Sequence, residues 1–517
     1  MICGGKERVH LELRLGSKSI SYFEKAYDAV FSREETAESV VPDVMPDIGE
    51  ILSADGIVLL RSKEAEQGRV TLTGNIETSV LYLPDGESGI KKLYLSIPFS
   101  TSAESTLFFE TTRVVAALKL LAIEARMLNP RKVLVKACVC VDLKCYGKSE
   151  ALICYGVEDG NEEVLTKTAQ CVLNPVMGVR EKTFVLSDEY AIPQSNPEFG
   201  EVLGERVNFV IEDMKPVGDK LIFKGAAQVV LLYLSADESE VEALAYTTPF
   251  SQIIEMDGTY EYEQLDAEVC LTLTGAYFEP LPLTSEGRVI SAEIHAVAQV
   301  TCAEKTELTY LADAYSNSCD IEIYRETIEM ECVERRMTAR ETLRELCETP
   351  TPVRDVLYTY ATILTPQVRE NAVTCPVGIF VMYRDDSGKI CSISKEYEVG
   401  ADVEGEAGVR LFVSDTRCME IYAVGVAGGI DIRAPLEIDI AVITMVQLES
   451  IYGIEMSDEQ TGVRLEHPSV TVVRAESADI WELAKKYQST PELIAAVNST
   501  ADSGESVRKM LLIPRAR

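Results

Sequence analysis

Residues 70–83 read VTLTGNIETSVLYL, and residues 221–234 read LIFKGAAQVVLLYL. In both stretches the residues at alternate positions are mainly apolar, the fifth residue is Gly and the last three are Leu-Tyr-Leu. A period of two is typical of a β-strand with one buried face. The two stretches therefore predict equivalent strands, and their separation of 151 residues indicates an internal duplication.

The same separation relates residues on both sides of these strands. The pairs that lie 151 residues apart include Pro42 and Pro193, Pro46 and Pro197, Leu52 and Leu203, and Pro98 and Pro249. A constant offset over about 60 positions indicates a repeated unit. Gly on the apolar face of a strand weakens it, so Gly74 and Gly225 predict a β-bulge or the close approach of another backbone.

A third, more divergent copy follows. Residues 373–383 alternate in the same way, with Cys375 at the glycine position. Tyr383 lies 301 residues after Tyr82, close to twice the first separation. A second alternating block ends each unit, at residues 133–141, 290–298 and 434–442. We therefore expect a mainly β protein with three tandem, sandwich-like repeats.

One stretch has conflicting signals. Residues 112–127 are rich in Ala, Leu and Val, and their intrinsic propensity favours a helix. Their counterpart, residues 268–281, contains Cys-Leu-Thr-Leu-Thr-Gly, which favours a strand. Repeats share a fold, so we expect a strand in every copy.

A different module ends the chain. Strands are predicted at residues 470–474 and 510–513, and Thr490-Pro491 predicts a helix start with Thr as N-cap. Apolar residues with helical spacing are Ile480, Leu483, Ala484 and Tyr487 in one helix and Leu493, Ile494 and Val497 in the next. We expect a small strand–helix–helix–strand (βααβ) module whose core includes Trp481, the single tryptophan.

The chain thus divides into five segments. The expected boundaries are residues 1–165 for the first unit with N-terminal strands, 166–315 for the second, 316–456 for the third, 457–468 for a linker and 469–517 for the C-terminal module.

Composition narrows the class of function. The formal net charge of −35 argues against nucleic acid and anionic membranes as partners, because phosphates attract basic surfaces. The charge favours either solubility or attraction to a basic partner. No run of about 18 apolar residues predicts a membrane span, and the N-terminal residues do not resemble an export signal. The 14 cysteines include no C-x-x-C pair, so we expect reduced thiols in the cytoplasm.

Residues suited to catalysis are few. The histidines are His10, His295 and His467. His295 shares the polar face of its strand with Glu293 and Gln299, so we expect it to be exposed. Cys138 and Cys140 share a strand face, which we interpret as ordinary thiols rather than metal ligands.

Asp43 and Asp47, beside Pro residues, predict a turn. No phosphate-binding loop or nucleophile elbow is present. We expect no enzymatic activity, no catalytic residue, no metal and no cofactor.

The C-terminal module resembles the LysM domain in residues 480–487 (IWELAKKY), 491–494 (PELI) with Asn498, and 511–514 (LLIP). That resemblance implies binding of N-acetylglucosamine polymers such as peptidoglycan, in a groove framed by the first strand–helix loop and the loop after the second helix. The residues it implies for a partner or glycan are Ser477, Ala478, Asp479, Ile480, Asn498 and Ser499. Ser477-Ala478-Asp479 replaces the Gly-Asp-Thr of the family, so we expect this loop to bind a protein.

The repeats resemble the SPOCS domain of spore-forming Firmicutes in residues 41–48 (VPDVMPDI) and 129–133 (NPRKV) and in Gly74 and Leu81-Tyr82. SPOCS repeats followed by one LysM domain resemble the SipL family of clostridial spore-coat morphogenetic proteins. This resemblance implies a scaffold in the mother-cell cytoplasm, at the forespore surface or spore coat, that binds a SpoIVA-like spore coat morphogenetic protein through its LysM domain. The alternatives are a LysM protein that binds peptidoglycan or cortex, and an enzyme of unrecognised chemistry.

Overall fold

The computed structural model describes ten stretches of the chain, and all structural statements below refer to them. They are residues 10–86, 89–158, 163–256, 265–281, 288–369, 372–403, 409–457, 469–474, 479–499 and 510–516. Within these stretches the chain is mainly β, as predicted, and the two helices lie near the C-terminus.

Two three-stranded antiparallel arrays form the first unit, and they pack face to face. One array consists of β3 (Ile48–Glu66), β4 (Arg69–Pro84) and β5 (Lys91–Glu104). The other consists of β2 (Leu15–Val40), β7 (Lys132–Val157) and β6 (Arg113–Asn129). Alternate residues of β4 and β7 point between the arrays and form the core of this sandwich.

The second unit repeats this pairing. The first array is β10 (Phe199–Val217), β11 (Lys220–Ser235) and β12 (Val241–Glu255). The second is β9 (Val176–Ala191), β14 (Val289–Glu304) and β13 (Leu265–Pro280). A single pairing of β9 with β2 joins it to the β2–β7–β6 array of the first unit in one six-stranded sheet. The strands predicted for residues 112–127 and 268–281 are therefore confirmed, and in the first of them tertiary pairing overrides helix propensity.

The third unit has the same order of pairing with two strands broken into shorter pieces. One array is β17 (Val353–Ile363) and β18 (Gln367–Arg369), both beside β19 (Ala372–Asp385), with β20 (Ile390–Asp402) on its other edge. The other is β16 (Ile321–Glu348) beside β23 (Gly429–Ser457), followed by β21 (Arg410–Cys418) and β22 (Tyr422–Val426).

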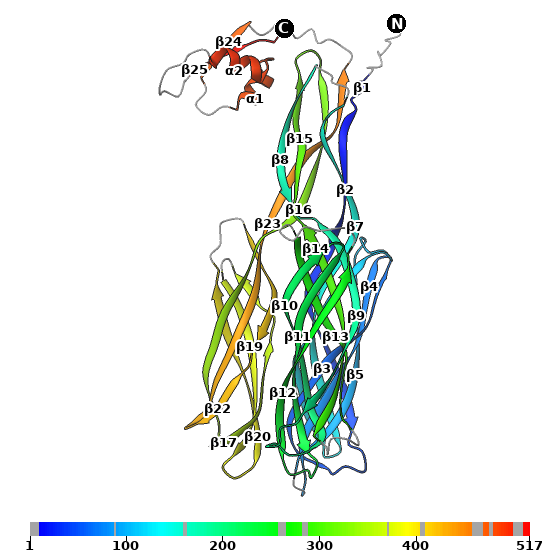
Figure 1. Cartoon of the computed structure of the whole chain (residues 1–517), viewed down its shortest axis with the longest axis vertical. Coiled ribbons are helices and arrows are strands. Elements are labelled where there is room, and N and C mark those ends of the chain that lie inside the picture. The colour runs from blue at the N-terminus through cyan, green and yellow to red at the C-terminus, as the bar shows by residue number, and fades with distance from the viewer. Residues whose placement is uncertain are drawn as a thin grey trace.

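Above the sandwiches, three two-stranded ribbons continue upward, one from each unit (Figure 1). β2 with β7 and β16 with β23 are unbroken continuations of sandwich strands, and β23 also pairs with β1 (His10–Glu12). The remaining ribbon pairs β8 (Val164–Leu173) with β15 (Thr306–Ser316) and is called the β8–β15 ribbon here. Apolar side chains from all three ribbons pack against one another.

The glycine positions show both features predicted for them. Opposite Gly74 the register of β3 shifts between Leu60 and Ser62, and opposite Gly225 the register of β10 shifts between Ile211 and Asp213. These shifts are β-bulges, and they push the bulged strand toward the glycine. A Cβ on Gly225 would lie 2.1 Å from the carbonyl oxygen of Val210.

Cys375 explains why the third unit differs here. It occupies the glycine position of β19, and the neighbouring strand is interrupted between Ile363 and Gln367, at that level. A residue with a Cβ leaves no space for the bulged strand to approach, so the pairing breaks into β17 and β18.

We expect Gly225→Ala to destabilise the second unit by about 1–3 kcal/mol, because the added methyl group collides with backbone that cannot move freely. Gly400→Ala is the matched control, since it is also a strand glycine but a Cβ there meets nothing within 4 Å. That control should be neutral or slightly stabilising. Urea unfolding checks this, and equal midpoints for the two variants would contradict the close-approach explanation.

The three units meet at one buried junction built from equivalent positions. Asp55, Arg206 and Tyr360 each pair across the sheet with a residue three positions before the repeated Tyr of their unit. The guanidinium of Arg206 donates to both carboxylate oxygens of Asp55, at 2.6 and 3.2 Å, and lies 3.3 Å from the ring centroid of Tyr360. Equivalent positions of the three units thus supply an anion in the first, a cation in the second and an aromatic ring in the third.

Apolar residues surround this junction. They come from the outward faces of the β4, β11 and β19 arrays and include Leu81, Leu232 and Met382, the residues before the repeated tyrosines. Burial raises the pKa of Asp55, and the charge of Arg206 opposes that shift. The pKa of Asp55 stays raised, so the ion pair offsets part of the desolvation cost of burying this carboxylate.

We expect Arg206→Met to destabilise the three-unit body by about 3–5 kcal/mol, because it leaves a buried carboxylate without its partner. The double variant Asp55→Leu with Arg206→Met should recover most of that loss, since it removes both charges. Arg33→Met, at an exposed arginine, is the control and should change stability by less than about 0.5 kcal/mol. Equal losses for single and double variants would argue against this pair.

Candidate functional site

The C-terminal module has the predicted order of elements. β24 (Val470–Arg474) pairs with β25 (Met510–Pro514), and α1 (Ile480–Lys486) and α2 (Pro491–Ser499) lie between them in the chain. Thr490 Oγ1 accepts a hydrogen bond from the backbone N–H of Leu493 at 3.2 Å, as expected of an N-cap. Asp479 caps α1 in the same way, accepting from the N–H of Trp481 at 2.9 Å.

The prediction that Leu493, Ile494 and Val497 form one buried apolar face of α2 is wrong in part. Ile494 is buried, but Leu493 and Val497 are 39% and 41% exposed, and Ile480 on α1 is 42% exposed. A two-stranded sheet covers only one row of side chains on a short helix, so the flanking apolar residues remain at the surface.

Trp481 is buried, as predicted, but the residues that bury it come from two parts of the chain. Within the module it clusters with Leu483, Ala484 and Ile494. Its other neighbour is Tyr315 of the β8–β15 ribbon, whose ring meets the indole edge to face with centroids 4.8 Å apart. The module is therefore docked on the ribbon, beside its tip (Figure 1).

Asp313 on β15 is the polar centre of this docking contact. Its carboxylate accepts hydrogen bonds from Trp481 Nε1 at 2.8 Å and from Lys485 Nζ at 2.7 and 2.9 Å. Arg325 of β16 donates to the same carboxylate at 2.7 Å. Burial raises the pKa of Asp313, but the hydrogen bonds from Lys485 and Trp481 outweigh burial and hold it below its usual range.

Further polar contacts frame the same face. Lys167 Nζ of β8 lies 2.7 Å from Asp479 Oδ2. The hydroxyl of Tyr315 and the side-chain amide of Asn317 each donate to the carbonyl oxygen of Ser489, both at 2.9 Å. The contact thus combines two carboxylates, an indole N–H and aromatic packing in one specific arrangement.

The expected partner- or glycan-binding residues have different locations. Asp479 caps α1 and faces Lys167, and Ile480 lies at the surface beside it. Asn498 connects α2 to β25: its amide donates to the carbonyl of Leu512 at 2.7 Å and its oxygen accepts from the Leu512 N–H at 3.0 Å. Ser499 ends α2. Ser477 and Ala478 lie outside the described residues.

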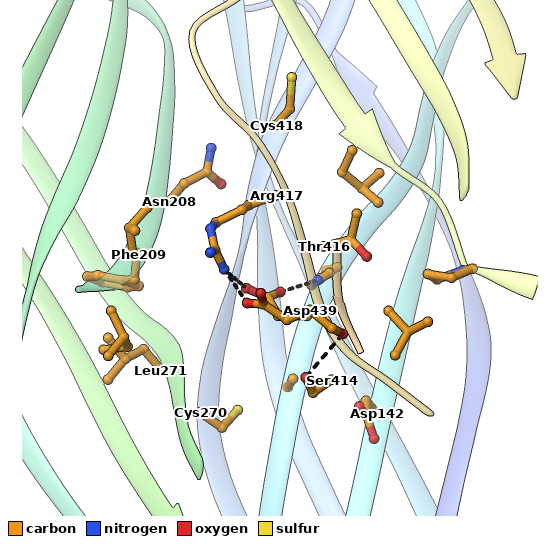
Figure 2. A pocket seen from close by; sticks show the side chains of 18 of the residues that line it. Asp142, Asn208, Phe209, Cys270, Leu271, Ser414, Thr416, Arg417, Cys418 and Asp439 are labelled. Carbon is orange, nitrogen blue, oxygen red and sulfur yellow. Dashed lines mark hydrogen bonds and ion pairs between the residues drawn. The ribbon is translucent and has the colours of Figure 1, made fainter. Parts of the chain in front are cut away.

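A second candidate site is the cavity of about 1620 Å³ between the three sandwiches. Figure 2 shows part of its lining, including Arg417, whose guanidinium lies 2.5 Å from Asp439 Oδ2. Lys144, also in the lining, is 3.1 Å from Glu268. Asp142 has one buried oxygen without a hydrogen-bond partner, and burial raises its pKa.

Arg417 and Lys144 are both paired with carboxylates of the protein, so neither is an unpaired cation that would attract an anionic ligand into the cavity. Among the described residues, no group of three or more His, Cys, Asp or Glu side chains is placed to hold a metal ion. The absence of a metal and of a catalytic centre stays a prediction.

His295 and Gln299 differ from each other, although they share a strand face. The His295 side chain is 36% exposed, and its Nε2 lies 2.5 Å from Glu293 Oε1. Gln299, on the same polar face of the strand, is buried. Its side-chain amide pairs with the backbone N–H and C=O of Ala116, at 2.8 and 2.9 Å. This face is covered because the first and second units pack together there.

Arg131 explains the two sequence stretches that resemble SPOCS signatures. Its guanidinium donates to atoms of the loop between β2 and β3, at 2.7–3.0 Å; the acceptors are the carbonyls of Val41, Pro42 and Met45 and the carboxylate of Asp47. The turn predicted around Asp43 and Asp47 is confirmed. Arg288 donates in a similar way to the carbonyls of Pro193 and Asn196 in the second unit.

The repeated tyrosine completes this loop. The hydroxyl of Tyr82 donates to the carbonyl of Pro46 at 3.2 Å, and that of Tyr233 donates to the carbonyl of Pro197 at 3.0 Å. In both units, therefore, an arginine and a tyrosine side chain donate hydrogen bonds to carbonyl oxygens of the proline-containing loop.

Comparison with known families identifies these units. Residues 47–106 and 199–273 match the family described as SipL, SPOCS domain. These two segments are similar to the SPOCS domain of SipL. The matched SPOCS segments contain the β3–β4–β5 and β10–β11–β12 arrays, and the match connects the chain with sporulation. No curated protein and no solved structure matches the chain.

We expect docking of the C-terminal module on the β8–β15 ribbon to weaken at acid pH. The hydrogen bonds that hold Asp313 ionised lower its pKa from 3.8, and Lys167 and the Trp481 N–H lower that of Asp479. A lowered pKa contributes stability above the ordinary value and loses it as pH falls below that value. Docking should therefore be constant from neutral pH to about pH 5 and weaken below about pH 4.

Acrylamide quenching of Trp481 fluorescence measures this, because the chain has one tryptophan. Quenching should increase in acid, before the circular dichroism of the β-sheets changes. Asp313→Asn should already show greater quenching at neutral pH. A loss of docking between pH 5 and 7, or none down to pH 3, would contradict the assignment to these carboxylates.

Proposed function

We propose that this protein is a non-enzymatic scaffold of spore-coat assembly that binds a SpoIVA-like coat protein through its C-terminal module. The observation that carries the proposal is the pair of SPOCS matches, at residues 47–106 and 199–273. A scaffold needs rigid units joined in a defined order, and the buried junction at Arg206 supports that requirement.

The same proposal includes a third SPOCS repeat and a LysM assignment for the module. The strand pairing of residues 321–457 parallels that of the two matched units, which supports the third repeat. The βααβ order and the antiparallel pairing of β24 with β25 support the LysM assignment. The proposed segment boundaries are those expected from the sequence.

We place the scaffold in the mother-cell cytoplasm, at the forespore surface or in the coat. Every described cysteine is a free thiol, which fits a reducing compartment. Among the described residues, no helix has the length and apolar character needed to cross a membrane.

Charge is distributed unevenly between the body and the module. Residues 469–517 carry seven Lys or Arg and six Asp or Glu. Since the whole chain has a net charge of −35, residues 1–468 carry −36. The module is therefore the part of the chain on which an acidic partner meets the least repulsion.

A pull-down from sporulating cells tests the proposal. The full chain should retain the SpoIVA-like coat protein, and a chain that lacks residues 468–517 should not, because the truncation removes the module. The retained proteins are identified by mass spectrometry, and purified peptidoglycan is offered to both chains in parallel.

Equal retention by both chains would contradict binding through the module. Strong peptidoglycan binding without a retained protein would favour the alternative of a peptidoglycan- or cortex-binding protein.

A further inference from the structure

The face of the module that contains Trp481 is already occupied in this chain. Trp481 and Lys485 contact Asp313, and Asp479 contacts Lys167. Trp481 is 7% exposed and Asp313 is 9% exposed. Any partner that binds this face must therefore first separate the module from the β8–β15 ribbon.

The chemistry of the occupied face indicates what it recognises. It offers an indole N–H and an ammonium group to one carboxylate, and an aromatic ring that meets a tyrosine ring edge to face. Asp313 and Tyr315 lie two residues apart on β15, so both side chains point to the same face of the strand. A charge-assisted hydrogen bond beside an aromatic contact gives both strength and geometric selectivity.

We propose that this face is a recognition surface for a carboxylate next to an aromatic residue, that the β8–β15 ribbon occupies it as an internal ligand, and that a protein partner with an acidic, aromatic segment must displace the ribbon. The inference rests on the proposed function, in which the module binds a coat protein. The near-neutral module suits such a segment, whereas the body with its charge of −36 repels it.

Substituting the ribbon residues tests the proposal by whether the affinity for the partner rises or falls. Asp313 and Lys167 lie outside the module, so changing them removes nothing from the surface that the partner contacts. Because binding is weakened by the fraction of molecules in which the face is closed, releasing the ribbon should strengthen it. Trp481→Ala changes the module itself and should weaken binding.

The experiment measures the affinity of full-length variants for the purified SpoIVA-like coat protein of the same organism. Asp313→Asn should bind about tenfold more tightly than the unchanged chain if the face is closed in about nine molecules of ten. Lys167→Glu should act in the same direction with a smaller effect, and it is safe for folding because the side chain is 41% exposed. Asp213→Asn, at an exposed position on β10, is the matched control and should leave affinity unchanged.

Acrylamide quenching of Trp481, measured on the same samples, should increase for Asp313→Asn and Lys167→Glu but not for Asp213→Asn. Greater quenching without any gain in affinity would overturn the inference and leave the proposed function intact, with the exposed Ile480, Leu493 and Val497 as the contact surface. Unchanged quenching in both ribbon variants would also overturn it, since the ribbon would then not hold the face closed. If no chain binds the coat protein, the proposed function fails and this inference fails with it.

Discussion

A buried ion pair between Asp55 and Arg206 is the contact on which the arrangement of the three sandwiches depends. Each charge would be costly in an apolar interior without the other, and the leucines around them would be exposed if the units separated. Tyr360 of the third unit covers the guanidinium, so all three units are needed to complete the site. The junction thus explains why the three sandwich units form one body rather than separate domains connected by linkers.

The contact between module and body follows the same physical rule on a smaller scale. Asp313 is kept ionised by donors from two sources: Arg325 of the body, and Trp481 and Lys485 of the module. When the module leaves, Arg325 still pairs with the carboxylate, so the released body is not left with an uncompensated charge. A docking contact of this kind can be strong and selective, yet reversible. At the Asp55 junction, separation of the first two units would remove the Arg206 cation and leave a neutral donor, the backbone N–H of Gly56, at 2.8 Å.

Features set by local pattern could be predicted from the sequence, and features set by distant partners could not. The glycine bulges follow from strand parity alone, and the strand at residues 113–129 follows from its counterpart in the second unit. The junction leaves no pattern, because equivalent positions carry Asp, Arg and Tyr and meet only in three dimensions. Burial of Trp481 was predictable, but its contact with Tyr315 was not. The small size of the module was the available signal, because so short a segment cannot enclose a tryptophan without help from another part of the chain.

The unbroken strands set a length scale for the molecule. β23 has 29 residues and β16 has 28, and an extended strand rises about 3.3 Å per residue, so each reaches roughly 90 Å. Both run from the sandwich loops at one pole to the ribbons at the other (Figure 1). β16 and β23 stay hydrogen-bonded to each other over this length, with β-bulges between Tyr324 and Arg325 and between Val333 and Arg335. The length of these two strands therefore sets the distance between whatever binds at the sandwich loops and whatever binds at the ribbons.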